Sequence, residues 1–145
     1  MGSEDHELTE ILSEDQVVEA VSQYLSELGY REVRRSLVTE QGVDLVMIKD
    51  GKELHIEAKG QGSSRSTSAR YGKVFNSGQV MDHVAKAMLT ALEVVATGKH
   101  RAGIALPGDR LHRSRIERIT PVLDMLHIAV FLVGPSDNIV SANGL

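Results

Sequence analysis

The sequence has 145 residues and a formal net charge of -4, with 41% hydrophobic and 25% charged residues, which predicts one globular domain. It contains no cysteine, which excludes disulfides and thiolate metal sites, and no apolar run near the roughly 18 residues that span a membrane. We therefore expect a cytoplasmic protein without a membrane partner. The charge is uneven, because residues 1–30 hold eight acidic residues and no lysine or arginine, while the remaining 115 residues carry a net charge of +4. Since local patches set the attraction for a polyanion, nucleic acid is not excluded.

The first part of the sequence predicts a loose segment followed by a helix. Residues 1–13 are polar and acidic and are expected to be loose, and residues 14–145 are expected to form a single domain. At the start of this domain, apolar residues recur at three- and four-residue spacing, which predicts an α-helix. Ser13 is suited to cap this helix, with Gln16 as its capping-box partner. The polar stretch 30–41 is typical of a first strand.

Two apolar strands joined by a tight turn are predicted next, over residues 43–48 and 53–59. The Asp-Gly pair at residues 50–51 is preferred at the centre of a two-residue type I′ hairpin, and such a turn fixes the pairing register. In that register Asp44 lies opposite Glu57, with their Cβ atoms about 4.5–5.5 Å apart on one face of the sheet. The hairpin thus brings two carboxylates together.

The charged residues on that face suggest a metal site. Directly opposed carboxylates repel each other, so Asp44 and Glu57 destabilise the strand pair unless a divalent cation lies between them. Oxygen ligands without cysteine favour Mg²⁺, for which Mn²⁺ can substitute. Lys59 emerges on the same face, and the set suits metal-assisted hydrolysis of a phosphodiester. A solvated charged face is the alternative interpretation.

A long polar loop, residues 60–78, follows the hairpin. It is rich in glycine and serine and has basic but no acidic residues. Arg65, Arg70 and Lys73, with the hydroxyls and backbone amides around them, suit contacts with nucleic-acid phosphates. Tyr71 suits stacking on an unpaired base. An unstructured surface loop is the alternative interpretation.

The second half of the sequence predicts alternating helices and strands. Apolar periodicity predicts a helix over residues 79–97, and residues 101–107 are typical of a short buried strand. A helix over 112–127 with Pro121 in its middle, a buried strand over 128–134 and a short edge strand in the tail complete the chain. The order α-β-β-β-α-β-α-β predicts an α/β domain with a mixed central sheet flanked by helices.

The six histidines show no spacing typical of a metal site. Neither His-x-x-x-His nor Glu-x-x-His occurs, and no glycine-rich phosphate-binding motif is present. The sequence therefore predicts neither a histidine metal site nor a nucleotide cofactor.

The motifs of the hairpin resemble those of a known nuclease superfamily. The stretch Gly-Val-Asp ending at Asp44, twelve further residues and the stretch Glu-Ala-Lys ending at Lys59 resemble the PD-(D/E)XK, or restriction-endonuclease-like, nucleases, with Val43 in place of the proline. The opening of the domain is similar to that of Holliday-junction resolvases and of restriction endonucleases that cut modified DNA. The resemblance covers residues 14–133 and implies a three-layer restriction-endonuclease-like fold.

The same resemblance implies roles for individual residues. Asp44 and Glu57 would bind Mg²⁺, and Lys59 would be the catalytic lysine. Glu19 on the first helix would be a further metal ligand, for which an exposed helix glutamate is the alternative interpretation. Gln79, at the start of the helix after the hairpin, would be a further catalytic residue.

Three functions are open on the sequence alone. The first is a Mg²⁺-dependent DNA endonuclease acting on branched, modified or single-stranded DNA, with a homodimer expected by analogy. The second is a nuclease-like domain that binds nucleic acid or protein without cutting. The third is an oligomeric interaction scaffold. The complete set of Asp44, Glu57 and Lys59 favours the first.

Overall fold

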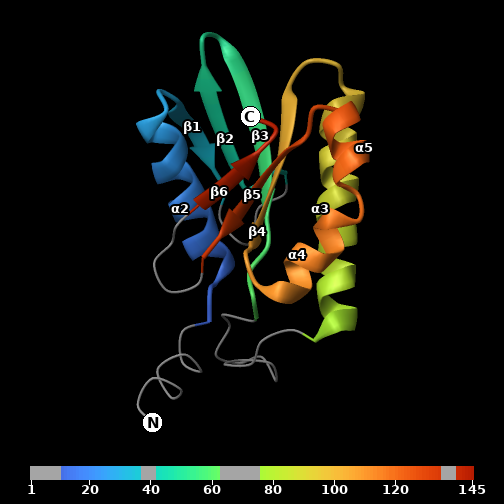
Figure 1. Ribbon diagram of the computed structural model, residues 1–145. Helices are drawn as coiled ribbons and strands as arrows, with labels where there is room; N and C mark the ends of the chain where they lie inside the picture. The colour runs from blue at the N-terminus through green and yellow to red at the C-terminus, as the bar shows by residue number, and fades with distance from the viewer. Residues whose placement is uncertain (1–10, 37–41, 63–75, 135–139) are drawn as a thin grey trace.

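The computed structural model describes residues 11–36, 42–62, 76–134 and 140–145. These residues form one six-stranded sheet with helices packed against it (Figure 1). The helices are α2 (Glu14–Glu27), α3 (Ser77–Ala96), α4 (Arg110–Glu117) and α5 (Thr120–Met125). The strands are β1 (Arg31–Arg35), β2 (Leu45–Lys49), β3 (Lys52–Ala58), β4 (Arg101–Pro107), β5 (Ala129–Val133) and β6 (Val140–Asn143).

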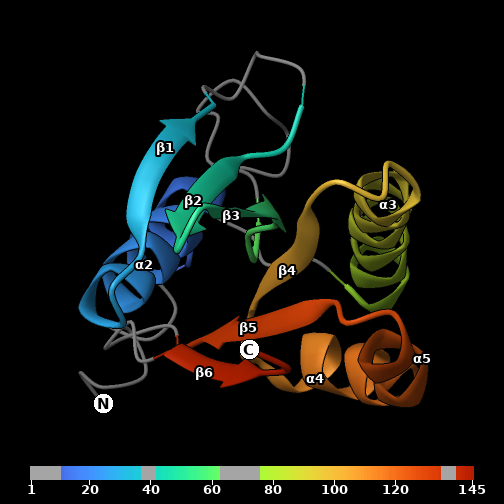
Figure 2. The ribbon, with the colours of Figure 1, turned by 90° about the horizontal axis from the view of Figure 1, so that it is seen from above.

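The helices lie on both faces of the sheet. Helix α2 covers one face, and α3, α4 and α5 lie on the other (Figure 2). Each face has its own apolar core, because alternate residues of a strand point to opposite faces. In β3, Leu54, Ile56 and Ala58 are buried against the α2 side. The residues between them therefore face the α3 side.

The strands are hydrogen-bonded in the order β1-β2-β3-β4-β5-β6. The first three form an antiparallel meander, β3, β4 and β5 are parallel, and β6 is antiparallel to β5. Parallel neighbours need a long crossover, which α3 supplies between β3 and β4 and the α4–α5 pair supplies between β4 and β5. The prediction of a mixed sheet flanked by helices is confirmed.

The β2–β3 hairpin has the predicted turn and register. Asp50 and Gly51 have φ angles of 53° and 76°, the left-handed values that a type I′ turn requires at both central positions. Lys49 pairs with Lys52, and the ladder continues outward to Leu45 and Ile56. This register brings the residue before β2 to the end of β3.

Two helices begin with a capping box. At α2, Ser13 Oγ accepts a hydrogen bond from Gln16 N, and Gln16 Oε1 accepts one from Ser13 N. Helix α3 begins two residues earlier than predicted, since Asn76 and Gln79 form the same reciprocal pair. The predicted cap of the first helix is therefore confirmed.

The predicted helix over 112–127 is two helices. Helix α4 begins at Arg110, where Asp109 Oδ1 accepts a hydrogen bond from His112 N at 2.9 Å. Pro121 lies in the first turn of α5, where its missing N–H leaves no hydrogen bond unmade. The predicted edge strand of the tail is β6. None of the described helices is both long and apolar enough to cross a bilayer.

Candidate metal and catalytic site at the end of strand β3

Asp44 is held beside the end of β3 by the backbone of that strand. Its backbone N–H donates to Ile56 O at 3.1 Å, and its carboxylate Oδ2 accepts a hydrogen bond from Ala58 N at 2.8 Å. Hydrogen bonds from both the main chain and the side chain fix this carboxylate. It therefore lies next to Glu57, as the hairpin register requires.

Glu57 and Lys59 lie on the α3 side of β3 and face each other. Lys59 Nζ is 3.5 Å from Glu57 Oε2, and the two side chains are only 15% and 13% exposed. Lys59 N donates to Ala105 O at 3.0 Å, which continues the pairing with β4 and anchors the lysine backbone. Glu57 Oε1 is buried and has no hydrogen-bond partner among the described residues. This oxygen is available to a cation.

A third carboxylate, that of Glu14, joins the pair from the start of α2. The helix can approach because Gly60 has no side chain: a Cβ there would lie 2.6 Å from Glu14 N and 2.9 Å from Ser13 C. Gln61 N donates to Leu12 O at 2.7 Å, and Leu12 N donates to Gln61 Oε1 at 3.0 Å. The chain just after Lys59 is thus docked on the chain just before the helix.

Crowding of the three carboxyl groups changes their acidity. Burial and the neighbouring Asp44 charge raise the pKa of Glu57 from its ordinary value of 4.5 to about 7, against the opposing charge of Lys59. Burial and the same Asp44 charge raise the pKa of Glu14 to about 7. Asp44 thus affects both of these carboxyl groups. The cluster gathers more negative charge than its own lysine neutralises.

The cluster fits a hard divalent cation. Carboxylate oxygens are the ligands that Mg²⁺ and Mn²⁺ prefer, and Glu14, Asp44 and Glu57 supply them. Within the described part of the chain, the one group of three potential ligands whose atoms all lie within 4.8 Å of one another is elsewhere, at Glu53, His55 and His100. The more open carboxylate set suits Mg²⁺, which usually keeps several waters.

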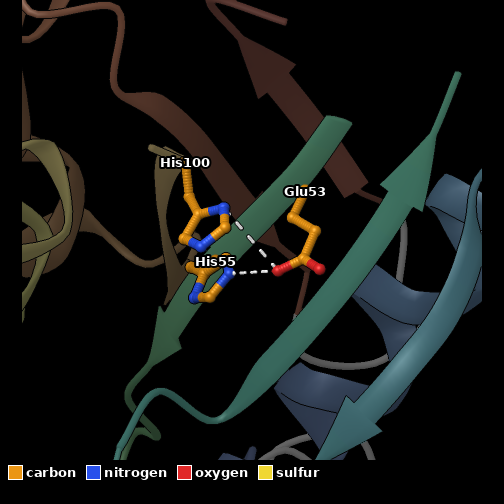
Figure 3. A group of neighbouring side chains, drawn as sticks. All are labelled: Glu53, His55 and His100. Carbon is orange, nitrogen blue, oxygen red and sulfur yellow. Dashed lines mark hydrogen bonds and ion pairs between the residues drawn. The ribbon is translucent and has the colours of Figure 1, made fainter. Parts of the chain in front are cut away.

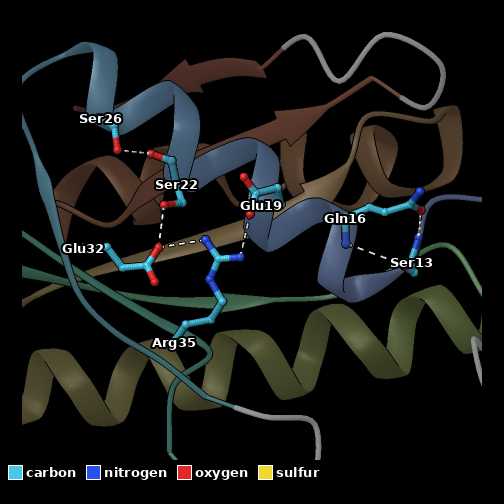
Figure 4. Close-up of polar contacts among 7 residues, drawn as sticks. All are labelled: Ser13, Gln16, Glu19, Ser22, Ser26, Glu32 and Arg35. Carbon is cyan, nitrogen blue, oxygen red and sulfur yellow. Dashed lines mark hydrogen bonds and ion pairs between the residues drawn. The ribbon is translucent and has the colours of Figure 1, made fainter.

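Glu19, the helix acid predicted as a metal ligand, lies away from this cluster. Its side chain is 63% exposed, and its Oε1 accepts a hydrogen bond from Arg35 Nη1 at 2.7 Å. Arg35 also contacts Glu32, which accepts a hydrogen bond from Ser22 Oγ (Figure 4). Glu19 thus belongs to a polar network between α2 and β1. The helix acid that contacts Asp44 is Glu14.

Gln79, predicted as catalytic, uses its side chain to cap α3. Its Oε1 accepts a hydrogen bond from Asn76 N at 2.8 Å. His83 lies one turn further along α3, and the charge of Lys59 affects its pKa. Burial, together with the charge of Lys59, lowers the pKa of His83, which favours a neutral imidazole beside the cluster.

The predicted nucleic-acid contacts fall in the loop between β3 and α3. Arg65, Arg70, Tyr71 and Lys73 lie outside the described residues. Their proposed role is neither supported nor contradicted by the structure. The described ends of the loop, at residues 59–62 and 76–79, lie at the same end of the sheet as the carboxylates (Figure 1).

No model of a known protein family matches this chain, and no curated protein matches it. A function for the chain therefore has to be inferred from its own residues. The strongest guide is the gathering of Glu14, Asp44, Glu57 and Lys59 at one end of the sheet.

Proposed function

We propose that this chain is a metal-dependent DNA endonuclease of the PD-(D/E)XK type, with a restriction-endonuclease-like fold. The observation that carries the proposal is the cluster itself. Asp44, Glu57 and Lys59 resemble the superfamily's motif in sequence, and they meet at one end of a mixed sheet with helices on both faces. A helix carboxylate, Glu14, completes the set.

Glu14, Asp44 and Glu57 are the residues that would hold Mg²⁺, for which Mn²⁺ can substitute. When bound, the ion would neutralise the scissile phosphate and lower the pKa of a water molecule. The protein holds two of these carboxylates in place, because Asp44 accepts a hydrogen bond from Ala58 N and Glu57 is largely buried.

Lys59 is positioned to act on the reacting groups. Its Nζ lies 3.5 Å from Glu57 Oε2, so its ammonium group lies beside a proposed metal ligand. It can hold the attacking water and stabilise the negative charge that develops on the phosphate. His83, whose pKa is lowered by burial and by the charge of Lys59, lies near this lysine.

Branched, modified or single-stranded DNA is the proposed substrate class, with Arg65, Arg70, Lys73 and Tyr71 as proposed contacts. Cutting both strands of a duplex would need two copies of the site, so a homodimer is part of the proposal. Binding through lysine and arginine would weaken steeply with salt.

A cleavage assay tests the proposal. Supercoiled plasmid, linear duplex, single-stranded DNA and a four-way junction are incubated with Mg²⁺, Mn²⁺ or EDTA. We expect cleavage with either metal and none with EDTA, and a loss of about 100- to 1,000-fold in Lys59→Met. Lys52→Met is the matched control, since Lys52 lies exposed at the other end of the same strand. Metal binding without cleavage of any substrate would overturn the endonuclease proposal.

The alternative is an inactive nuclease-like module that binds nucleic acid or oligomerises, and it shares one supporting observation with the homodimer of the first proposal. Helix α3 exposes an apolar stripe: Met81, Leu89 and Leu92 are 52%, 60% and 40% exposed, and Ala85 is exposed between them. These residues recur at three- and four-residue spacing and so share one face of the helix. Light scattering at several concentrations, with Leu89→Glu beside the wild type, separates a dimer through this face from a monomer.

A further inference from the structure

A second polar cluster lies toward the opposite end of β3. Glu53 and His55 are two residues apart and therefore emerge on the same face of the strand. His100 directly precedes β4, and because Leu54 pairs with Arg101, it lies beside Glu53 (Figure 3). One carboxylate and two imidazoles thus meet from two parallel strands.

The donor atoms of this cluster are close together. Glu53 Oε1 lies 2.8 Å from His55 Nε2 and 3.7 Å from His100 Nδ1, and all three ligand atoms lie within 4.8 Å of one another. Ligand atoms bound to one tetrahedral Zn²⁺ at roughly 2.0–2.1 Å are separated by about 3.4 Å. The observed separations of 2.8 Å and 3.7 Å lie on both sides of that value.

We propose that Glu53, His55 and His100 form a binding site for a late first-row transition-metal ion such as Zn²⁺, separate from the carboxylate cluster. Two imidazole nitrogens and one carboxylate oxygen are a donor set typical of zinc, whereas Mg²⁺ prefers oxygen alone. Three protein ligands leave a fourth position for water. The proposal does not depend on the nuclease activity.

The surroundings favour a nitrogen-bound metal over a cation held by charge alone. Arg34 lies close enough to affect Glu53, and Lys52, Lys99 and Arg101 line the adjoining cavity. These cations oppose a hard ion such as Mg²⁺, whose binding is largely electrostatic.

The two imidazole rings must separate when a metal binds. They are stacked, with centroids 4.2 Å apart and an interplanar angle of 13°. A metal ion lies near the plane of each imidazole that binds it, so two parallel rings cannot both bind one ion well. The side chains of His55 and His100 are 17% and 33% exposed. His100 also lines an open cavity of about 630 Å³ together with Glu53, which leaves room for the His100 ring to turn.

The two sites share one face of β3 without overlapping. Glu57 is four positions after Glu53, which corresponds to about 13 Å along a strand. A metal bound by His55 and His100 would also join β3 to the start of β4. We therefore expect zinc to raise the thermal stability of the protein.

The test is a calorimetric titration of Zn²⁺ into tag-free protein, with Co²⁺ absorption as a spectroscopic measure of the coordination. We expect one zinc site that is weakened by at least about 10- to 100-fold in both His100→Ala and His55→Gln. Tetrahedral Co²⁺ bands in the wild type should disappear in the same two variants. Circular dichroism and thermal unfolding without metal check that both variants fold.

Two control variants make the result specific. His127→Asn removes an exposed histidine outside the cluster, and asparagine tolerates the φ of 56° at that position. Glu57→Gln alters the carboxylate cluster alone. Both are expected to bind zinc as the wild type does. The proposal would be overturned if His100→Ala bound zinc with unchanged affinity. It would also be overturned if Glu57→Gln lost zinc binding while the histidine variants kept it.

Discussion

The pKa values of Glu53 and Glu57, two glutamates on one face of β3, are shifted in opposite directions. The His55 hydrogen bond, above all, lowers the pKa of Glu53, whereas burial and Asp44 raise the pKa of Glu57 to about 7. Both residues belong to β3 and point to the α3 side of the sheet. Strand alternation therefore determines the face on which each side chain lies, whereas the neighbouring elements determine its pKa.

The neighbours differ because different segments reach the two ends of the strand. At the Glu57 end, the start of α2 and the residue before β2 bring two more carboxylates. At the Glu53 end, the α3–β4 connection brings the second of two imidazoles. The first set suits Mg²⁺ and the second suits Zn²⁺.

The largest expected effect comes from removing one carboxylate of the first set. Asp44→Asn keeps a side-chain oxygen for the hydrogen bond from Ala58 N but loses the negative charge that a cation needs. We expect cleavage of DNA to fall by about 100- to 1,000-fold. Zinc binding, measured by calorimetry on the same preparation, should not change. A simultaneous loss of zinc binding would show that the two ends of β3 are not independent sites.

The next effect separates two glutamates of helix α2. Glu14 contacts Asp44, whereas Glu19 is paired with Arg35 on the surface. We expect Glu14→Gln to weaken Mg²⁺ binding and cleavage by about 10- to 100-fold, as loss of a supporting metal contact typically does. Glu19→Gln should stay within about twofold of the wild type. A larger loss in Glu19→Gln than in Glu14→Gln would identify Glu19 as the metal ligand of this helix.

Glu14 and Glu19 also show how much of the site could be predicted from the sequence. Local rules predicted the α2 cap at Ser13, the hairpin turn and the pairing register, because each depends on neighbours in the chain. They placed Asp44 beside Glu57 for the same reason. Which α2 residue meets them depends on how the helix docks on the sheet. Periodicity does not contain that information, although the glycine directly after Lys59 is a signal of close approach.

The histidine cluster was missed for a similar reason. His55 and His100 come from different strands, so no short spacing connects them, and only the parallel pairing of β3 with β4 brings them together. Parallel pairing joins residues that are far apart in sequence. The split of the predicted helix at Pro121 is a more local difference, which the preference of proline for a first turn explains.

A moderate effect is expected from Gly60→Ala, which tests how α2 is brought to the carboxylate end. The added Cβ would lie 2.6 Å from Glu14 N, a backbone atom, so the helix or the end of β3 must shift. We expect a loss of about 1–3 kcal/mol in the free energy of unfolding. Cleavage should fall as well, because Glu14 moves with the helix.

The control for that substitution is Gly78→Ala in α3. The nearest atom to a Cβ there is Asn76 Oδ1 at 3.5 Å, an ordinary contact, and alanine favours a helix. Urea unfolding should therefore show equal or greater stability for Gly78→Ala. Equal stability of Gly60→Ala and the wild type would contradict the proposed close packing.

The smallest effect concerns the free energy of unfolding in the absence of metal, and its size depends on pH. Because the pKa of Glu57 is about 7 in the folded protein and its ordinary value is 4.5, the folded state holds a proton that the unfolded state releases between those values. This contribution is fully present below about pH 4.5 and is lost as the pH rises through 7. Burial and Asp44 outweigh the attraction of Lys59, so charged Glu57 destabilises the metal-free protein.

Glu57→Gln should remove this destabilisation of the metal-free protein by charged Glu57, and it also removes a proposed metal ligand. At pH 8 with EDTA, we expect the variant to be more stable than the wild type by roughly 1–2 kcal/mol, allowing for solvent screening. At pH 5 the difference should shrink, and with Mg²⁺ at pH 8 it should narrow because only the wild type gains a bound ion. Urea unfolding at both pH values, with Glu19→Gln as the exposed control, measures the difference. A variant less stable than the wild type at pH 8 would mean that the attraction between Glu57 and Lys59 outweighs the repulsion among the carboxylates. The excess of negative charge that is proposed to attract a cation to this end of β3 would then be absent.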